Sequence, residues 1–265
     1  MVVRVKKKAA VKTVTRTALC GATADYIEVR GRDLVSELIG KLSFTEMFLF
    51  HLTGKKPGAL QVAVVDAVLV AIMEHGLVPS AIAARLTLLG APESYQGAIA
   101  AGLLGVGDRF AGTASQCAAL LDRIVAAPAP EREALARGIV ETYRRERRPL
   151  PGFGHPTHRS GDPRVPRLLE IARAHGAPGR YIEALRQLET ALSQVLGHSL
   201  PTNVSSAIAV VLREAELPAE VTRGIVLTAR CAGLVGHLLE EMHEPAAEAM
   251  WQAVERAVPY RPRQR

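Results

Sequence analysis

The chain has 265 residues, of which 48% are apolar, 22% charged and 4% aromatic. This composition can fill a hydrophobic core, so it excludes a disordered or fibrous protein. The formal net charge is +7, but ten of the 33 basic residues lie in the acid-free segments 1–17 and 256–265. The remaining 23 basic and 26 acidic residues give the interior a net charge of −3. The basic pI reflects the two ends, and with no basic patch interleaved with aromatic residues we expect no nucleic-acid binding.

Helical patterns follow one another along most of the chain. Ser43 and Glu46 have the spacing of a capping box, and Gly54 is placed to end the helix that it opens. No long stretch alternates with period two, so we expect an all-α fold of roughly ten helices. Other helices are predicted from Asp33, at 59–73, at 80–89, at 181–196, from Pro218 to Gly224 and from Gly224 to His243.

The uncharged stretch from Thr190 to Leu212 raises the question of a membrane span. It contains glutamine, proline and asparagine, so two buried helices joined by a polar turn fit it better. The chain starts without an apolar core of signal-peptide length. Its three cysteines form no CxxC pair, which favours a reducing compartment. We therefore expect a cytoplasmic protein that has no membrane partner.

Residues 148–167 form the segment richest in glycine, proline and histidine. A long loop of this kind in a helical protein often carries function. Gly152 and Gly154 allow unusual backbone angles, and His155 and His158 lie close to several arginines. The alternative is a surface loop with solvated charges. Two histidines three residues apart, with no further ligand motif, do not make a metal site, so we predict none.

The residues of this loop point to a family. PGFGHPTHRSGDPR at 151–164 resembles the GFGH…DPR segment of the citrate synthase superfamily. The likeness is strongest to its short members, the citryl-CoA lyases, and to the C-terminal module of ATP-citrate lyase. It extends over about residues 20–245. Four further segments resemble family motifs in the same order: MEHG at 73–76, LLGVGDRFAGT at 103–113, LPTNVSSAIAVVL at 200–212 and TARCAGLVGHLLEEM at 228–242.

The resemblance implies a mainly α, citrate-synthase-like fold made of two helical domains with the active site in the cleft between them. The large domain would comprise residues 1–126 and 230–265, including a basic tail at 1–17, and the small domain residues 127–229. Family members are dimers or larger assemblies, so a homodimer or higher homo-oligomer is expected.

The resemblance also implies a reaction. The enzyme would make or break the carbon–carbon bond between an acyl-CoA such as acetyl-CoA and a 2-oxo acid such as oxaloacetate. The CoA thioester would be a substrate, and no permanently bound cofactor is expected. His155 would take the hydroxyl proton in cleavage and return it in condensation. His75, Arg164 and Arg230 would bind the substrate carboxylates, Arg261 would complete the neighbouring subunit's site, and Arg148 and Arg159 would contact CoA phosphates.

The roles of Arg230, His198 and His237 can also be judged without the family resemblance. Arg230 lies in an apolar helix, where a buried guanidinium needs an anion, and an internal salt bridge is the alternative to a substrate. We expect His198 and His237 to have structural roles.

Two departures from the family pattern bear on the chemistry. Asp108 stands in the GVGDRF turn about where citrate synthases carry a histidine, a replacement shared with the lyases. Ser205 occupies the position of the family's catalytic aspartate, and a serine hydroxyl cannot take up a proton unaided at neutral pH. We predict that Asp108 is the acid/base partner of His155. The alternatives are that a water supplies this function or that the chain is a non-catalytic regulatory protein that binds CoA or carboxylates.

Overall fold

The computed structural model describes residues 16–154 and 161–262. The chain divides into two compact units, one up to Pro57 and one from Gly58 onward. This boundary differs from the predicted one, which separated a large domain from a small domain at residues 127–229. The large and small domains remain a prediction.

The first unit contains a small antiparallel sheet that the sequence patterns did not predict. Its strands are β1 (Cys20–Ala22), β2 (Ile27–Val29) and β3 (Arg32–Asp33), with Cys20 opposite Val29 and Glu28 opposite Asp33. They are too short for alternation to be recognised, and their side chains are largely exposed.

A short π-helical turn, η1 (Leu34–Leu38), and helix α1 (Phe44–Thr53) follow the sheet. Ser43 and Glu46 form the predicted capping box, and Gly54 ends α1 in the left-handed conformation at φ 70°. Both predictions are confirmed. The aspartate at 33 caps η1 through the Ser36 backbone N–H, but the turn that it opens is much shorter than the predicted helix.

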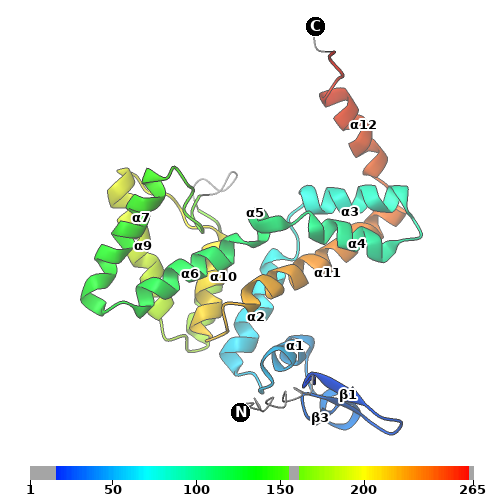
Figure 1. Cartoon of the computed structure of the whole chain (residues 1–265), viewed down its shortest axis with the longest axis horizontal. Coiled ribbons are helices and arrows are strands. Elements are labelled where there is room, and N and C mark those ends of the chain that lie inside the picture. Colours follow the sequence, from blue (N-terminus) through cyan, green and yellow to red (C-terminus); the bar gives the residue numbers. More distant parts are fainter. Residues whose placement is uncertain (1–15, 155–160, 263–265) are drawn as a thin grey trace, which may run out of the picture. The chain divides into compact units, whose positions relative to one another are not determined.

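The regular elements of the second unit are helices joined by loops, within the described residues (Figure 1). The all-α prediction is confirmed apart from the small sheet of the first unit. No helix in the described ranges is both long and apolar enough to cross a bilayer. The elements are α2 (Ala59–Ile72), α3 (Pro79–Gly90), α4 (Tyr95–Leu104), α5 (Gly107–Ala111), α6 (Thr113–Ala126), the 3₁₀ turn η2 (Ala129–Glu131), α7 (Arg132–Arg145), α8 (Arg164–Ala174), α9 (Arg180–Leu196), α10 (Val204–Glu214), α11 (Val221–His243) and α12 (Ala247–Ala257).

The prediction for residues 190–212 is confirmed, whereas the predicted helix break at Gly224 is not. The uncharged stretch after Thr190 is the end of α9, a turn and the start of α10, as expected. The predicted break at Gly224 is wrong, because α11 runs unbroken from Val221 to His243. A single glycine weakens a helix by only about 1 kcal/mol, which tertiary packing overrides.

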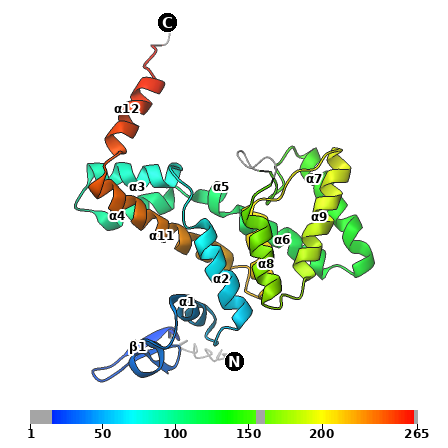
Figure 2. The same ribbon diagram turned by 180° about the vertical axis from the view of Figure 1, so that it is seen from behind.

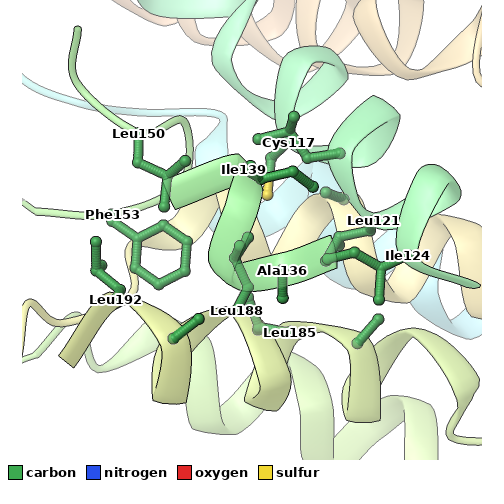
Figure 3. Close-up of a cluster of buried hydrophobic side chains, with 14 of the residues drawn as sticks. Cys117, Leu121, Ile124, Ala136, Ile139, Leu150, Phe153, Leu185, Leu188 and Leu192 are labelled. Carbon is green, nitrogen blue, oxygen red and sulfur yellow. The ribbon is translucent and has the colours of Figure 1, made fainter. Parts of the chain in front are cut away.

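The helices of the second unit form two groups. In one group α6, α7, α9 and α10 pack around a large apolar core, and in the other α11 packs on α2, α3 and α4 (Figure 1). Helix α8 contacts both α10 and α2, and Figure 2 shows α8 beside α2 from behind. Figure 3 shows the larger core, where Leu188 of α9 and Phe153 of the glycine-rich loop face α6 and α7.

The glycine-rich loop is held against this core by close packing. Gly152 has φ 89°, and a Cβ there would lie 2.9 Å from both the Cys117 Sγ and the Ser206 Cβ. Only glycine fits this backbone and this space. Burial raises the pKa of Cys117 to about 12, so its thiol serves as packing surface. The loop then pairs with the segment before α10 through Phe153 and Thr202.

Glu189 of α9 lies half-buried beside this pairing. Burial raises the pKa of its carboxyl, and a hydrogen bond from Thr202 offsets only part of that effect. A group with a raised folded-state pKa contributes stability below its unfolded pKa and loses it as the pH rises through the folded value. At pH 7 the ionised carboxylate therefore destabilises the fold.

We expect Glu189→Gln to raise the melting temperature at pH 7, because the neutral amide keeps the Thr202 hydrogen bond without the buried charge. The difference from the unmodified protein should shrink as the pH falls toward the ordinary glutamate pKa of 4.5. Thermal unfolding followed by circular dichroism from pH 4 to 8 measures both effects. The control is Glu183→Gln on the same helix, where Arg186 lowers the carboxyl pKa, so this variant should gain no stability. An equal gain in both variants would contradict the prediction.

Candidate functional site

A cavity of about 360 Å³ lies in the second unit. Its lining comes from the end of α2 and the turn that follows it, the start of α3, α5, the start of α6, Gly154, the first residue of α8, the first turn of α10, and α11. Four of the predicted site residues are among the lining side chains: His75, Arg164, Ser205 and Arg230. They come from four different elements, so the fold brings together motifs that are far apart in the sequence.

Arg164 is held by a carboxylate that the sequence analysis did not assign. Asp162 has a fully buried side chain, and its two oxygens accept from Arg164 Nε at 2.9 Å and Nη2 at 2.8 Å. The same carboxylate accepts from the backbone N–H of Val204 at 3.0 Å, at the start of α10. Burial alone would raise the pKa of Asp162, but these donors outweigh it and lower the pKa to about 2. Asp162 thus joins α8 to α10 at the cavity.

Arg230 differs from Arg164 in lacking such a clamp. Its Nη1 is buried and has no hydrogen-bond partner among the described residues. Burial lowers the pKa of its guanidinium, and the nearby Glu74 carboxylate opposes part of that shift. A buried donor without a partner costs free energy that a bound anion would recover. The alternative was an internal salt bridge, but Arg230 forms no ion pair with any residue in the described part of the chain.

The first turn of α10 closes another side of the cavity. Asn203 caps this helix by accepting from the Ser205 backbone N–H at 3.0 Å, and its amide donates to the Gly154 carbonyl at 2.8 Å. Gly154 in turn donates its N–H to the Pro201 carbonyl. These bonds fix the glycine-rich loop to the helix that carries Ser205. The N-cap preference of asparagine was the signal available in the sequence.

The turn after α2 brings His75 to the cavity. Glu74 Oε1 accepts from the backbone N–H groups of His75 and Gly76, each at 2.6 Å. Burial raises the pKa of Glu74, but these two bonds and one from the His237 ring outweigh it, so the pKa is lowered. Gly76 has φ 68°, a left-handed conformation that suits glycine. Glu74 also lines the cavity, a position that the motifs of the sequence did not indicate.

Asp108 does not line the cavity. Its side chain is 74% exposed and forms an ion pair with Arg223 at 2.5 Å. The neighbouring Arg109 and Phe110 do line the cavity, and the Arg109 guanidinium lies over the Phe110 ring. The sequence motif located the right segment, but on a five-residue helix it could not tell which side chain faces inward.

The other predicted residues are placed as follows. His155 and Arg159 lie outside the described residues. Arg148 is exposed, pairs with Glu146 at 2.9 Å and stacks over Tyr143 away from the cavity lining. Arg261 is exposed after α12. His198 is exposed and His237 is buried in a hydrogen-bond network, and neither lines the cavity. Across the described ranges, no group of three or more side chains is arranged to hold a metal ion.

Known proteins resemble this chain in sequence and in structure. A family described as "Citrate synthase, C-terminal domain" matches residues 5–262. "Putative citrate synthase 2" of Mycobacterium bovis is 30% identical over 203 residues, which cover 74% of this chain and 52% of the relative. The chain therefore spans about half the length of the curated relatives that it matches.

Two solved structures have a similar fold. The citryl-CoA lyase from Hydrogenobacter thermophilus superposes with a TM-score of 0.83 at 27% identity, covering 96% of both chains. ATP citrate lyase from Methanothrix soehngenii, solved in complex with citrate and coenzyme A, gives a TM-score of 0.76 at 20% identity and covers 97% of this chain and 43% of that one. The family match over nearly the whole chain shows that this protein belongs to the citrate synthase family.

Proposed function

We propose that this protein cleaves or forms the carbon–carbon bond between a CoA thioester and a 2-oxo acid, and that citryl-CoA is its first substrate to test. The observation that carries the proposal is the cavity in which Arg230, Arg164 and His75 converge, where the buried Arg230 Nη1 has no partner within the described ranges. Guanidinium groups bind carboxylates through paired hydrogen bonds, so this lining suits a polycarboxylate. The likeness to a citryl-CoA lyase over 96% of both chains supports the same reaction class.

In the cleavage direction, His155 would accept the proton of the substrate hydroxyl. The carbon–carbon bond then breaks, its electron pair moves to the CoA thioester as an enolate, and the hydroxyl carbon becomes the carbonyl of the 2-oxo acid. The enolate must take up a proton at carbon to give the acyl-CoA. Arg230, Arg164 and His75 would hold the carboxylates of the 2-oxo acid throughout.

The proton that the enolate takes up is balanced by the one that His155 removed from the hydroxyl. We propose that the Asp108 carboxylate accepts this proton and passes it to the enolate carbon, because Ser205 stands at the family aspartate's position and cannot take up a proton unaided. The carboxylate would have to leave Arg223, and an exposed ion pair of this kind is worth little free energy. Asp108 lies on helix α5, and the two residues that follow it, Arg109 and Phe110, already line the cavity.

The function is tested by mixing the purified protein with citryl-CoA and measuring oxaloacetate and acetyl-CoA release. The reverse reaction is followed by thiol release from acetyl-CoA with oxaloacetate. We expect cleavage that is lost in Arg164→Met and retained in Arg167→Met, since Arg167 is an exposed arginine of the same helix paired with Glu170. Citryl-CoA cleavage that is absent from the unmodified protein would contradict the lyase proposal.

We expect Asp108→Asn to lower turnover by roughly 10²-fold or more while CoA affinity stays the same, because general acid/base groups contribute factors of this size. Arg223→Gln removes the ion-pair partner but keeps the carboxylate, so turnover should persist in that variant. Steady-state kinetics with citryl-CoA and calorimetric titration with CoA measure the two effects. Full turnover in Asp108→Asn would assign the proton to water or to another group.

A second candidate function is a regulatory protein that binds CoA or carboxylates without turnover. The observation in its favour is that, among the described lining residues, Glu74 is the one carboxylate, and its Oε1 already accepts three hydrogen bonds. This function would be established if the protein binds citrate and CoA and forms no product when it is given an acyl-CoA or citryl-CoA. It would then predict that Asp108→Asn changes nothing measurable.

We also propose that the active form is a cytoplasmic homodimer or larger homo-oligomer in which Arg261 completes the neighbour's site and Arg148 and Arg159 contact CoA phosphates. Mixing Arg261→Ala with Arg230→Met subunits tests the shared site. If each site uses Arg261 from the other subunit, some mixed dimers contain one intact site and activity reappears on mixing. Light scattering gives the oligomeric state. A monomer with full activity would overturn this assignment.

A further inference from the structure

One face of α11 is directed at the turn that carries His75. Arg230, Gly233 and His237 lie three and four residues apart, which places them on the same side of the helix. A Cβ at Gly233 would overlap the Met73 carbonyl oxygen, so the helix backbone approaches the end of α2 as closely as glycine permits. The helix that presents Arg230 to the cavity therefore also packs directly on the 73–76 turn.

His237 connects this helix to the turn through its ring. Its Nε2 lies 3.0 Å from Glu74 Oε1, and its Nδ1 faces Arg85 Nε at 3.2 Å and Nη2 at 3.0 Å. Arginine only donates hydrogen bonds, so Nδ1 must accept and the ring proton must be on Nε2. The Nε2–H then donates to Glu74. Arg85 thus selects the tautomer that can hold the Glu74 carboxylate.

Arg85 is itself fixed from α11. Its side chain is 2% exposed, and its Nη1 donates to Glu241 at 2.8 Å while its Nη2 donates to Glu240. Glu241 also accepts from the backbone N–H groups of Ala246 and Ala247. The donor that orients the histidine therefore has almost no freedom to move.

Glu74 connects His237 to the backbone of the 73–76 turn. The oxygen that accepts from His237 also accepts both backbone N–H groups of His75 and Gly76. Without an anchored carboxylate these two N–H groups lose their acceptor, and the left-handed turn at Gly76 loses its main support. The position of the His75 side chain at the cavity depends on that turn.

We propose that His237 is a positioning residue for the substrate site. Its ring, held in one tautomer by Arg85, orients Glu74, which fixes the turn that carries His75. This inference rests on the proposed function only in assigning His75 to substrate binding. It replaces the expectation that His237 is simply a buried structural histidine.

The test compares His237→Gln, His237→Leu and His243→Gln. Glutamine offers an amide donor for Glu74 and a carbonyl acceptor for Arg85, whereas leucine offers neither. His243 is an exposed histidine of the same helix and serves as the matched control. In the ligand-free protein, ¹H–¹⁵N spectra of the histidine rings should show the His75 signals displaced or broadened in His237→Leu. They should be close to normal in His237→Gln and unchanged in His243→Gln.

The kinetic arm uses citryl-CoA. We expect His237→Leu to lose roughly 10²-fold in kcat/KM, the size of effect that a small misplacement of a binding group produces, and His237→Gln to recover most of it. If the unmodified protein does not act on citryl-CoA, the proposed function fails while the ring spectra still test the positioning role. Unchanged His75 signals in a folded His237→Leu, or equal damage from leucine and glutamine, would overturn the proposal. If His237→Leu does not fold, the same ¹H–¹⁵N spectra are recorded for Glu74→Ala. Unperturbed His75 signals in that variant would also overturn the proposal.

Discussion

Arg230→Met is expected to stabilise the protein and to weaken its affinity for citrate strongly. Because the guanidinium Nη1 is buried with no partner among the described residues, the native state carries a desolvation penalty that methionine removes while keeping most of the side-chain volume. Unsatisfied buried donors cost about 1–3 kcal/mol, and the side chain is only partly buried, so we expect a gain of about 1 kcal/mol. Urea unfolding followed by circular dichroism measures this gain.

The same substitution removes the cation that we assign to a substrate carboxylate. Losing one partner of a buried, hydrogen-bonded charge pair costs about 2–5 kcal/mol, which corresponds to a loss of affinity of roughly 30-fold to 4,000-fold. Calorimetric titration with citrate measures it. Stability and binding should thus change in opposite directions, which is the signature of a group placed for a ligand at a cost to the fold.

The matched control for Arg230→Met is Arg167→Met. Arg167 is 67% exposed and pairs with the similarly exposed Glu170, so neither stability nor citrate affinity should change measurably. If Arg230→Met instead destabilises the protein, Arg230 has a structural partner, and the salt-bridge alternative raised from the sequence is correct. Unchanged citrate binding in a stabilised variant would remove Arg230 from the substrate site.

Local sequence signals predicted those parts of the fold that depend on local chemistry. Ser43, Glu46 and Gly54 start and end α1 as expected, because a cap is defined by residues within one turn of each other. The three strands escaped prediction because two or three residues cannot show a period. Gly224 was misjudged as a break, since the stability of α11 comes from its packing against α2, α3 and α4.

The site could be predicted to the level of its motifs and no further. The motif match led to His75, Arg164, Ser205 and Arg230, and the structure brings all four to one cavity. It could not give side-chain direction, so Asp108 was expected inside while its neighbour Arg109 lines the cavity. The supporting carboxylates Glu74 and Asp162 were missed as well, because the tertiary structure alone brings Glu74 to the His237 ring and Asp162 to the Val204 N–H.

The aspartate that holds Arg164 gives the largest stability effect that we expect. Asp162→Asn should cost about 3–5 kcal/mol, because removing one partner of a buried ion pair leaves the other charge uncompensated. The amide keeps one oxygen, which in the Oδ2 position can still accept from Arg164 Nη2 and the Val204 N–H. Its NH₂ group would then face Arg164 Nε, which loses its acceptor, so the hold on Arg164 weakens. Citrate affinity should fall with it, since the Arg164 guanidinium loses its fixed orientation.

The pH dependence separates this effect from a simple packing defect. Burial raises the pKa of Asp162 but its donors lower it to about 2, below the ordinary value of 3.8. A depressed folded-state pKa contributes stability that is fully present above the unfolded pKa and is lost as the pH falls through the folded value. The stability gap between the unmodified protein and Asp162→Asn should therefore be constant near neutral pH and narrow between about pH 4 and pH 2.

Urea unfolding at a series of pH values measures this gap. The control is Glu170→Gln on the same helix, whose exposed carboxylate pairs with the exposed Arg167 and should contribute little at any pH. A gap that stays the same down to pH 2 would mean that the aspartate acts through its shape and not through its charge. The lowered pKa and the clamp on Arg164 would then be unrelated to the stability of the junction between α8 and α10. If the stability gap closes on acidification, the ionised Asp162 carboxylate accounts both for the clamp on Arg164 and for the stability of this junction.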